Sequence, residues 1–98
     1  MMYGLTAPQF QFLSEFVLTP LNNKGAKVYL FGSRARGDHQ KFSDIDLLVE
    51  SQSDLKSLIG SLSEVLEASN FPFKVDIVED HQLAESYRPS VEKDKVLL

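Results

Sequence analysis

Apolar residues recur every three to four positions in two stretches, and this spacing predicts two amphipathic helices. The first covers residues 7–18, where Thr6 with Gln9 three residues later provides a capping box. We expect it to end at Thr19-Pro20, because a residue before proline avoids the α region. The second covers residues 54–69, with Ser53 as its expected cap.

Short apolar runs rich in β-branched and aromatic residues predict three strands between and after these helices. They cover residues 27–31, 44–50 and 73–79. A short helix is expected over about residues 81–87, and the tail at 96–98 should pack back on the core. The order of elements predicts an α/β fold, a small mixed β-sheet with flanking helices.

Polar residues at the ends of these strands predict how the strands are paired. Eleven residues between Gly32 and Asp44 are too few for an easy parallel crossover, so the first two strands should be antiparallel. The helix over 54–69 provides a crossover, so the second and third strands should be parallel. Asp44, Asp46 and Asp76 are then expected at one edge of the sheet.

Composition limits the classes of function. At 98 residues the chain should form one domain over residues 1–98, and its net charge of −4 argues against direct nucleic-acid binding. Cysteine is absent, there is no apolar run long enough to span a membrane, and the N-terminus lacks a basic region followed by an apolar one. These features favour a cytoplasmic protein that is not bound to a membrane.

The paired aspartates indicate a metal site. Residues i and i+2 of a strand point to the same face, so Asp44 and Asp46 should project together. Carboxylate oxygens suit Mg²⁺ or Mn²⁺. With Asp76 added, three carboxylates could hold two ions about 3.5–4 Å apart, as in enzymes of in-line displacement at phosphorus.

The turn after the first strand indicates a phosphate site. Gly32 lets the backbone approach an anion closely, Ser33 offers a hydroxyl and an amide, and the turn beginning at Arg34 can present further amides. Arg34 and Arg36 are expected to neutralise phosphate charge, and Gly37 should end the turn in a left-handed conformation.

Each of these elements alone has an ordinary structural interpretation. A Gly-Ser turn is usually only a turn, and an Asp-x-Asp pair is most often a solvated strand end. Asp76 lies between Val75 and Ile77, where an unpaired carboxylate is costly. The combination at this spacing favours the functional interpretation.

The spacing of Gly32-Ser33, ten residues and then Asp44-Ile45-Asp46 resembles the signature of the polymerase-β-type nucleotidyltransferase superfamily. The shortness of the chain and its Gly-Ser-Arg-Ala-Arg-Gly wording are similar to the minimal nucleotidyltransferases (MNT) of HEPN/MNT toxin–antitoxin pairs. The resemblance implies that Asp44, Asp46 and Asp76 are catalytic and bind metal, and that Gly32 and Ser33 hold the phosphates of ATP. It also implies that Asp76 activates the acceptor hydroxyl.

The resemblance further implies transfer of AMP from ATP to a hydroxyl, a tyrosine in some pairs, of a partner HEPN toxin in a hetero-oligomer. An alternative is an antitoxin that neutralises its partner by binding, with little or no catalysis. A small-molecule nucleotidyltransferase is less favoured, because the chain has no room for a second domain that holds the acceptor. No residue pattern selects the nucleotide base, the acceptor residue or the oligomeric state.

Overall fold

A four-stranded mixed sheet with the strand order β3-β2-β1-β4 forms the centre of the fold. The computed structural model describes residues 2–98. Its strands are β1 (Lys27–Phe31), β2 (Ile45–Glu50), β3 (Val75–Glu79) and β4 (Val96–Leu97). Its helices are α1 (Ala7–Leu13), α2 (Thr19–Asn22), α3 (Ser33–Arg36), α4 (Lys56–Ala68) and α5 (Arg88–Asp94), with a π-helical turn at Ser14–Leu18 and a 3₁₀ turn at Asp80–Gln82. The predicted fold class is confirmed.

The strand pairing agrees with the prediction from the polar strand ends. β1 and β2 are antiparallel, with Phe31 opposite Asp46. β2 and β3 are parallel, with Asp46 opposite Asp76. The two aspartates are therefore neighbours across the sheet, and each is the second residue of its strand.

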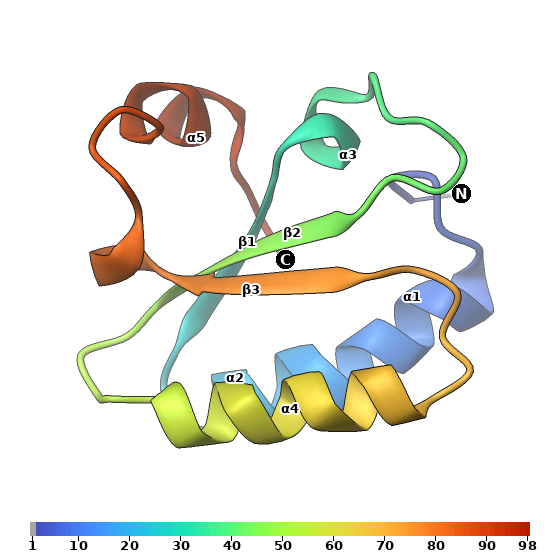
Figure 1. The fold of residues 1–98 in the computed structure, drawn as a ribbon, viewed down its shortest axis with the longest axis horizontal. Helices are drawn as coiled ribbons and strands as arrows, with labels where there is room; N and C mark the ends of the chain where they lie inside the picture. Colours follow the sequence, from blue (N-terminus) through green and yellow to red (C-terminus); the bar gives the residue numbers. More distant parts are fainter. Residues whose placement is uncertain (1) are drawn as a thin grey trace.

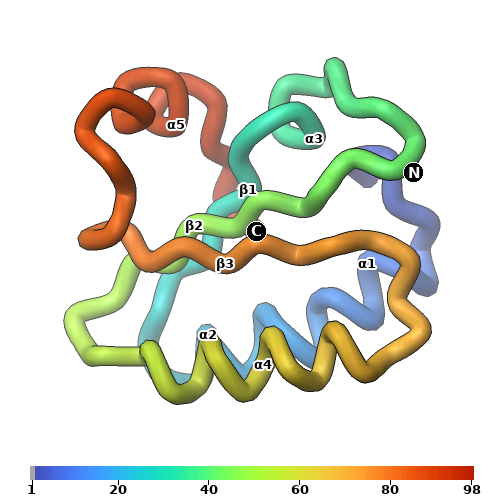
Figure 2. The backbone as a smooth tube through the Cα atoms, in the orientation of Figure 1, coloured from blue at the N-terminus to red at the C-terminus, as the bar shows by residue number. Residues whose placement is uncertain are grey.

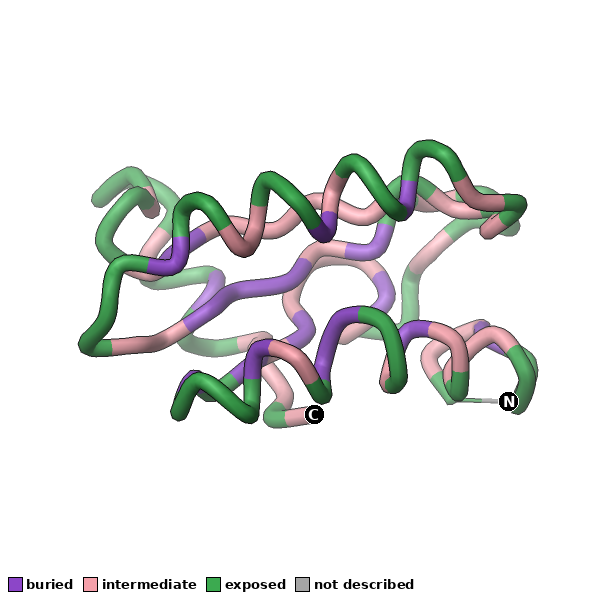
Figure 3. Tube along the Cα trace, turned by 90° about the horizontal axis from the view of Figure 1, so that it is seen from below, coloured by how far each residue is buried: buried purple, intermediate pink, exposed green. Residues whose placement is uncertain are grey.

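The helices divide between the two faces of the sheet (Figure 1). α1, α2 and α4 cover one face, and α3 and α5 lie on the other side. Coloured by burial, β2 is largely buried, β3 is mostly of intermediate burial, and α4 turns an exposed side outward (Figure 3). The core between the sheet and α1, α2 and α4 is built from side chains that alternate along the strands, among them Val28, Leu30, Ile45, Leu47 and Val49.

The chain ends pack against the rest of the fold. β4 pairs antiparallel with β1, and the Leu98 amide donates to the Val28 carbonyl at 2.9 Å, as predicted for the tail. The N-terminal segment lies beside the loop between α3 and β2 (Figure 2). Both ends thus help to hold β1 and the loop that follows it.

The prediction that the first helix ends at Thr19-Pro20 is wrong. The chain stays helical to Asn22: a π-helical turn at Ser14–Leu18, in which the Thr19 amide donates to the Ser14 carbonyl, leads directly into α2. Proline has no N–H to donate, and the helix continues past Pro20 with the π-helical turn before it.

The cap expected for the second amphipathic helix is also wrong. α4 begins at Lys56, with Leu55 and not Ser53 at its N-cap position. The Leu55 amide instead donates to Glu79 Oε1 at 3.4 Å, and Glu79 is 5% exposed. A carboxylate from the end of β3 therefore meets the start of α4, which local sequence does not reveal.

The helix expected over residues 81–87 is wrong in extent. Only a 3₁₀ turn forms at Asp80–Gln82, and the true helix, α5, begins at Arg88 with Pro89 in its first turn. Proline fits there because a first-turn N–H has no partner within the helix. No helix within residues 2–98 combines the length and apolarity needed to cross a membrane.

Candidate functional site

The sheet places the three predicted carboxylates at one edge, on the side where α3 and α5 lie. Asp46 and Asp76 are register partners on β2 and β3, so their side chains share a face. Asp44 precedes β2 by one residue and is exposed, whereas Asp46 is half-buried. On the other face, Ile45 and Leu47 are fully buried, as the alternation predicted.

Gly32 brings the predicted phosphate turn against this carboxylate edge. Its φ of 78° and ψ of −158° lie in a region that only glycine adopts readily. A Cβ at this position would lie 2.5 Å from Asp46 Oδ2. Glycine is therefore required both by the backbone conformation and by the closeness of the Asp46 carboxylate, so the turn and the carboxylates form one site.

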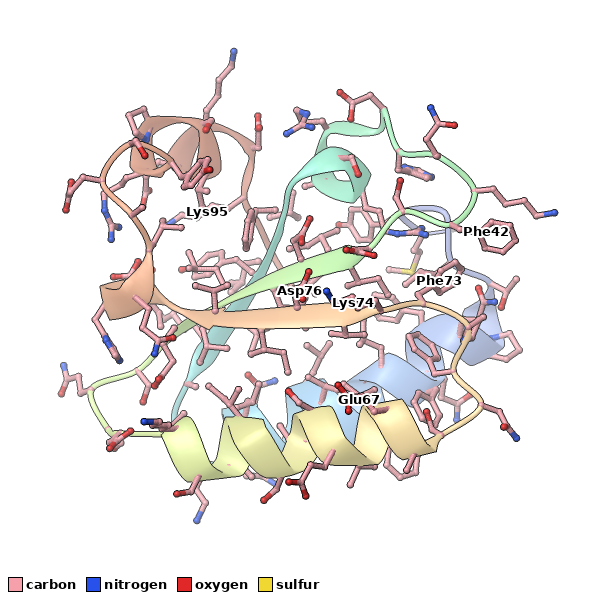
Figure 4. All side chains as sticks on the ribbon, in the orientation of Figure 1. Phe42, Glu67, Phe73, Lys74, Asp76 and Lys95 are labelled. Carbon is pink, nitrogen blue, oxygen red and sulfur yellow. The ribbon has the colours of Figure 1, made fainter. Side chains whose placement is uncertain are left out.

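Negative charge accumulates at this edge. Burial raises the pKa of Asp46 above its ordinary value, and the nearby charges of Asp76 and Asp44 raise it further. Arg36 and Lys74 oppose these effects. Lys74, the residue before β3, lies beside Asp76 (Figure 4), with its Nζ 3.6 Å from Asp76 Oδ1, but it is largely exposed. The carboxylates thus outweigh the cations that face them.

The donor set fits a hard divalent cation, because it consists of carboxylate oxygens with excess negative charge. Within residues 2–98, however, no three His, Cys, Asp or Glu side chains are grouped so as to hold a metal ion. Asp46 and Asp76 adjoin through the sheet register, whereas Asp44 lies in the connection before β2. The two strand aspartates therefore form the fixed part of such a site.

The turn from Gly32 to Gly37 has the predicted shape. Ser33 opens α3, and the Gly37 amide donates to the Ser33 carbonyl at 2.9 Å. Gly37 has a φ of 87° and a ψ of 7°, the left-handed conformation expected at the end of this turn. Ser33 follows Gly32 directly, so its backbone amide adjoins the residue that lies against Asp46.

The structure does not bring Arg34 into the site as an exposed phosphate ligand. Its side chain is 1% exposed. Nε and Nη2 donate to the Ser43 carbonyl at 3.1 and 2.9 Å, and Nη1 donates to the Tyr3 carbonyl at 2.9 Å. The guanidinium also lies over the Phe73 ring, 4.4 Å from its centroid. Burial lowers the pKa of Arg34, an effect that the charge of Asp44 opposes.

These contacts make Arg34 a clamp on the backbone that leads into the carboxylate pair. Ser43 is bonded directly to Asp44, so holding the Ser43 carbonyl fixes the chain immediately before β2. Arg34 also joins this loop to the N-terminal segment, through Tyr3, and to Phe73 ahead of β3. A planar guanidinium can make all these contacts at once, which a lysine ammonium cannot.

Arg36 is exposed at the rim of the site. Its Nε donates to Asp38 Oδ2 at 3.0 Å and its Nη1 to Asp94 Oδ2 at 3.2 Å. Both carboxylates raise the pKa of the Arg36 guanidinium. It is close enough to Asp46 to lower the pKa of that carboxyl, so it adds positive charge beside the carboxylates.

Two residues near the site were missed by sequence reasoning. Lys74 pairs with Asp76 and could have been found from its i, i+2 spacing at the start of the third strand. Asp94 pairs with Arg36 across 58 positions of sequence. No local signal points to Asp94, because it lies on α5, a helix that was not predicted.

The nucleotidyltransferase domain family matches residues 12–98 of the chain. A protein of Haemophilus influenzae named "Probable protein adenylyltransferase MntA" is 33% identical over 72 residues, which are 72% of this chain and 63% of that protein. The chain thus spans less than two thirds of the length of this curated relative.

Solved structures share the fold. A candidate minimal nucleotidyltransferase superposes with a TM-score of 0.71 at 31% identity, over 96% of this chain and 97% of the other. The crystal structure of a toxin–antitoxin with AMP-PNP gives a TM-score of 0.66 at 24% identity, over 86% of this chain and 70% of the other. The second similarity is one of fold.

Proposed function

The chain belongs to the nucleotidyltransferase domain family, and from that premise we propose that it transfers AMP from ATP to a hydroxyl of a partner protein. The observation that carries this proposal is the contact between the two halves of the site. Gly32 adjoins Asp46, and Asp46 lies opposite Asp76. Such a site can hold the phosphates of a nucleotide and the reacting hydroxyl next to one another.

In the proposed reaction the acceptor oxygen attacks the α-phosphorus of ATP and forms a new P–O bond. The bond from the α-phosphorus to the bridging oxygen breaks, and pyrophosphate leaves. Asp76, on the edge strand β3, accepts the proton of the hydroxyl. Ser33 and the Gly32 backbone hold the phosphates, and Arg36 stabilises charge on the leaving group.

Asp44, Asp46 and Asp76 would together hold two ions of Mg²⁺ or Mn²⁺. When bound, the ions neutralise the phosphate oxygens and align attacking and leaving groups. The residues themselves contribute mainly position and charge, as in other phosphoryl and nucleotidyl transfers. The position of Asp46 supports this role, because it is half-buried and lies beside the charges of Asp76 and Asp44, and burial first and these charges second raise its pKa.

The acceptor is proposed to be a tyrosine of a HEPN-domain toxin, so that the chain acts as its antitoxin. The name of the Haemophilus influenzae relative supports transfer of AMP to a protein. The resemblance of the Gly-Ser-Arg-Ala-Arg-Gly and Asp-Ile-Asp stretches to MNT antitoxins supports the HEPN partner.

A second candidate is an antitoxin that acts by binding alone. Large apolar side chains are exposed on the helices that cover the sheet face opposite the carboxylates. Phe16 is 46% exposed and Val65 on α4 is 48% exposed. A partner could bind this surface without using the nucleotide site.

Replacing both Asp44 and Asp46 with alanine separates the two candidates. The partner is the product of the neighbouring gene, copurified with the chain, and the readouts are partner binding and toxin neutralisation. If transfer is the function, the double variant keeps the partner but no longer neutralises it. If the double variant neutralises the toxin as well as the unchanged protein does, the transferase proposal is wrong and the binding candidate is supported.

A further inference from the structure

The strand β3 lies at the edge of the sheet, so one of its two sides is open. Within residues 2–98 it pairs with β2 alone, and Figure 1 shows it at the front of the sheet with no strand beyond it. The backbone N–H and C=O groups along such an edge are available to pair with another chain. The five residues of β3 are therefore a place where a further strand can be added.

The hydrogen bonds to β2 determine which groups of β3 face this open side. The Ile45 amide donates to the Lys74 carbonyl at 2.9 Å, so the Lys74 carbonyl faces β2. Backbone groups of successive strand residues face opposite sides of the strand, so the amides and carbonyls of Val75 and Ile77 face outward. Within residues 2–98, no backbone hydrogen bond outside the helices and strands uses these groups.

A groove of about 450 Å³ lies beside this edge, between β3 and the second half of α4. Its lining includes Leu66 and Glu67 from α4 and Val75, Asp76 and Ile77 from β3. Glu67 projects from α4 next to the strand that carries Asp76 (Figure 4). The groove therefore joins the open edge of the sheet to one of the candidate site's carboxylates.

A strand added to this edge would direct its side chains alternately to the groove and to the candidate site, because successive side chains point to opposite faces. Val75 and Ile77 pack against the core on the face that α4 covers, whereas Asp76 lies on the other face with Asp46. One set of side chains from the added strand would lie beside Val75 and Ile77, and the other set beside Asp76.

We propose that an extended segment of the partner protein pairs with the outer edge of β3 and presents the acceptor hydroxyl to Asp76. This inference rests on the proposed transfer to a partner protein, and it specifies how the acceptor reaches the site. Main-chain hydrogen bonds provide affinity in this mode of recognition, and the groove selects alternate side chains. Diagonal neighbours on paired strands are about 7–8 Å apart, within reach of an aromatic side chain, so a tyrosine diagonal to Asp76 suits the site.

A second copy of the chain is the other strand that this edge could accept. Pairing of β3 with β3 would bring a second Asp76 and the charge of its site to the same edge, where like charges are destabilising. Each copy also carries a net charge of −4. The partner segment is favoured because the groove is bordered by Asp76, the carboxylate that is proposed to take the proton of the acceptor.

Hydrogen exchange of single amides, followed by NMR, tests the proposal on the unchanged protein. In the chain alone, the outward amides of Val75 and Ile77 should exchange faster than that of Asp76, which faces β2. The product of the neighbouring gene is then added with Mg²⁺ and an ATP analogue that has a methylene bridge between its α- and β-phosphates. Exchange at Val75 and Ile77 should slow about tenfold or more.

The opposite edge of the sheet provides the control for this measurement. The Leu98 amide donates to the Val28 carbonyl, so by alternation the Leu97 amide on β4 faces outward. Exchange at Leu97 should not change when the partner is added.

Val75→Pro and Leu97→Pro test the same two edges by transfer kinetics. Each removes one outward N–H and no hydrogen bond of the sheet, and proline is tolerated at the first residue of a strand and on edge strands. With Val75→Pro the KM for the partner should rise about fivefold or more, while ATP binding measured by calorimetry stays unchanged. Leu97→Pro should leave both quantities unchanged.

The outcomes separate this proposal from the proposed function. Transfer of AMP to the partner with no slowing of exchange at Val75 and Ile77 would overturn the docking proposal and leave the transferase function intact. Slow exchange of both amides in the chain alone, lost on dilution, would assign the edge to a second copy and also overturn it. Slower exchange on addition of the partner, without transfer from ATP, would support docking on β3 and refute the transferase function.

Discussion

Replacing Gly32 with alanine should disturb both the fold and the site. The backbone at Gly32 has a φ of 78° and a ψ of −158°, and holding a non-glycine residue there costs about 1–3 kcal/mol. The added methyl group would lie 2.5 Å from Asp46 Oδ2, so the carboxylate must move. Forcing that side chain away from its rotamer adds about 0.5–1.5 kcal/mol. The free energy of unfolding should fall by about 1.5–4.5 kcal/mol in total.

Gly25→Ala is the matched control. Gly25 has a φ of +82°, yet nothing lies within 4 Å of the added Cβ. The Gly25→Ala variant should be destabilised only by the cost of the left-handed backbone, about 1–2 kcal/mol. Urea unfolding followed by circular dichroism measures both variants.

A double-mutant cycle isolates the contact between Gly32 and Asp46. In an Asp46→Ala background the carboxylate is gone, so Gly32→Ala should cost about 1 kcal/mol less than in the unchanged protein. Equal costs in the two backgrounds, or a Gly32→Ala variant no less stable than Gly25→Ala, would refute the assigned contact.

Two other changes test the backbone contacts of Arg34 and the charge of Asp46. Arg34→Met should lower the free energy of unfolding by about 2–4 kcal/mol, because it leaves the Ser43 and Tyr3 carbonyls without their donors, and a loss below about 1 kcal/mol in urea unfolding would contradict the clamp. In metal-free buffer, Asp46→Asn should be more stable than the unchanged protein at neutral pH by on the order of 1 kcal/mol, since it removes a half-buried like charge. In the folded protein the pKa of Asp46 is raised above its ordinary value. The Asp46 carboxyl therefore stabilises the unchanged protein below the ordinary carboxyl pKa, and this stabilisation is lost as the pH rises through the raised pKa. Urea unfolding over a pH series measures this, and a stability difference independent of pH would contradict it.

The strand register could be predicted because the lengths of the connections between the strands allow few arrangements. The connection between Gly32 and Asp44 is too short for a parallel crossover, and the helix before the third strand is long enough for one. These two constraints place Asp46 beside Asp76 without any knowledge of side-chain packing. Alternation then sends Ile45 and Leu47 to the core and Asp46 to the other face.

Features that depend on distant contacts could not be predicted. The start of α4 is met by Glu79 from the end of β3, whose carboxylate accepts from the Leu55 amide. Arg34 and Arg36 look alike in sequence, yet one is buried under the loop before β2 and the other is exposed. Their different roles depend on the carbonyls and carboxylates that the fold brings to each.

The most direct test of the account is transfer from ATP labelled either at the α- or at the γ-phosphate. The chain is incubated with Mg²⁺ and its copurified partner, and the partner is then examined for label. Attack at the α-phosphorus with loss of pyrophosphate predicts label on the partner from α-labelled ATP and none from γ-labelled ATP. Label from the γ position, or no label from either in any metal, would contradict it.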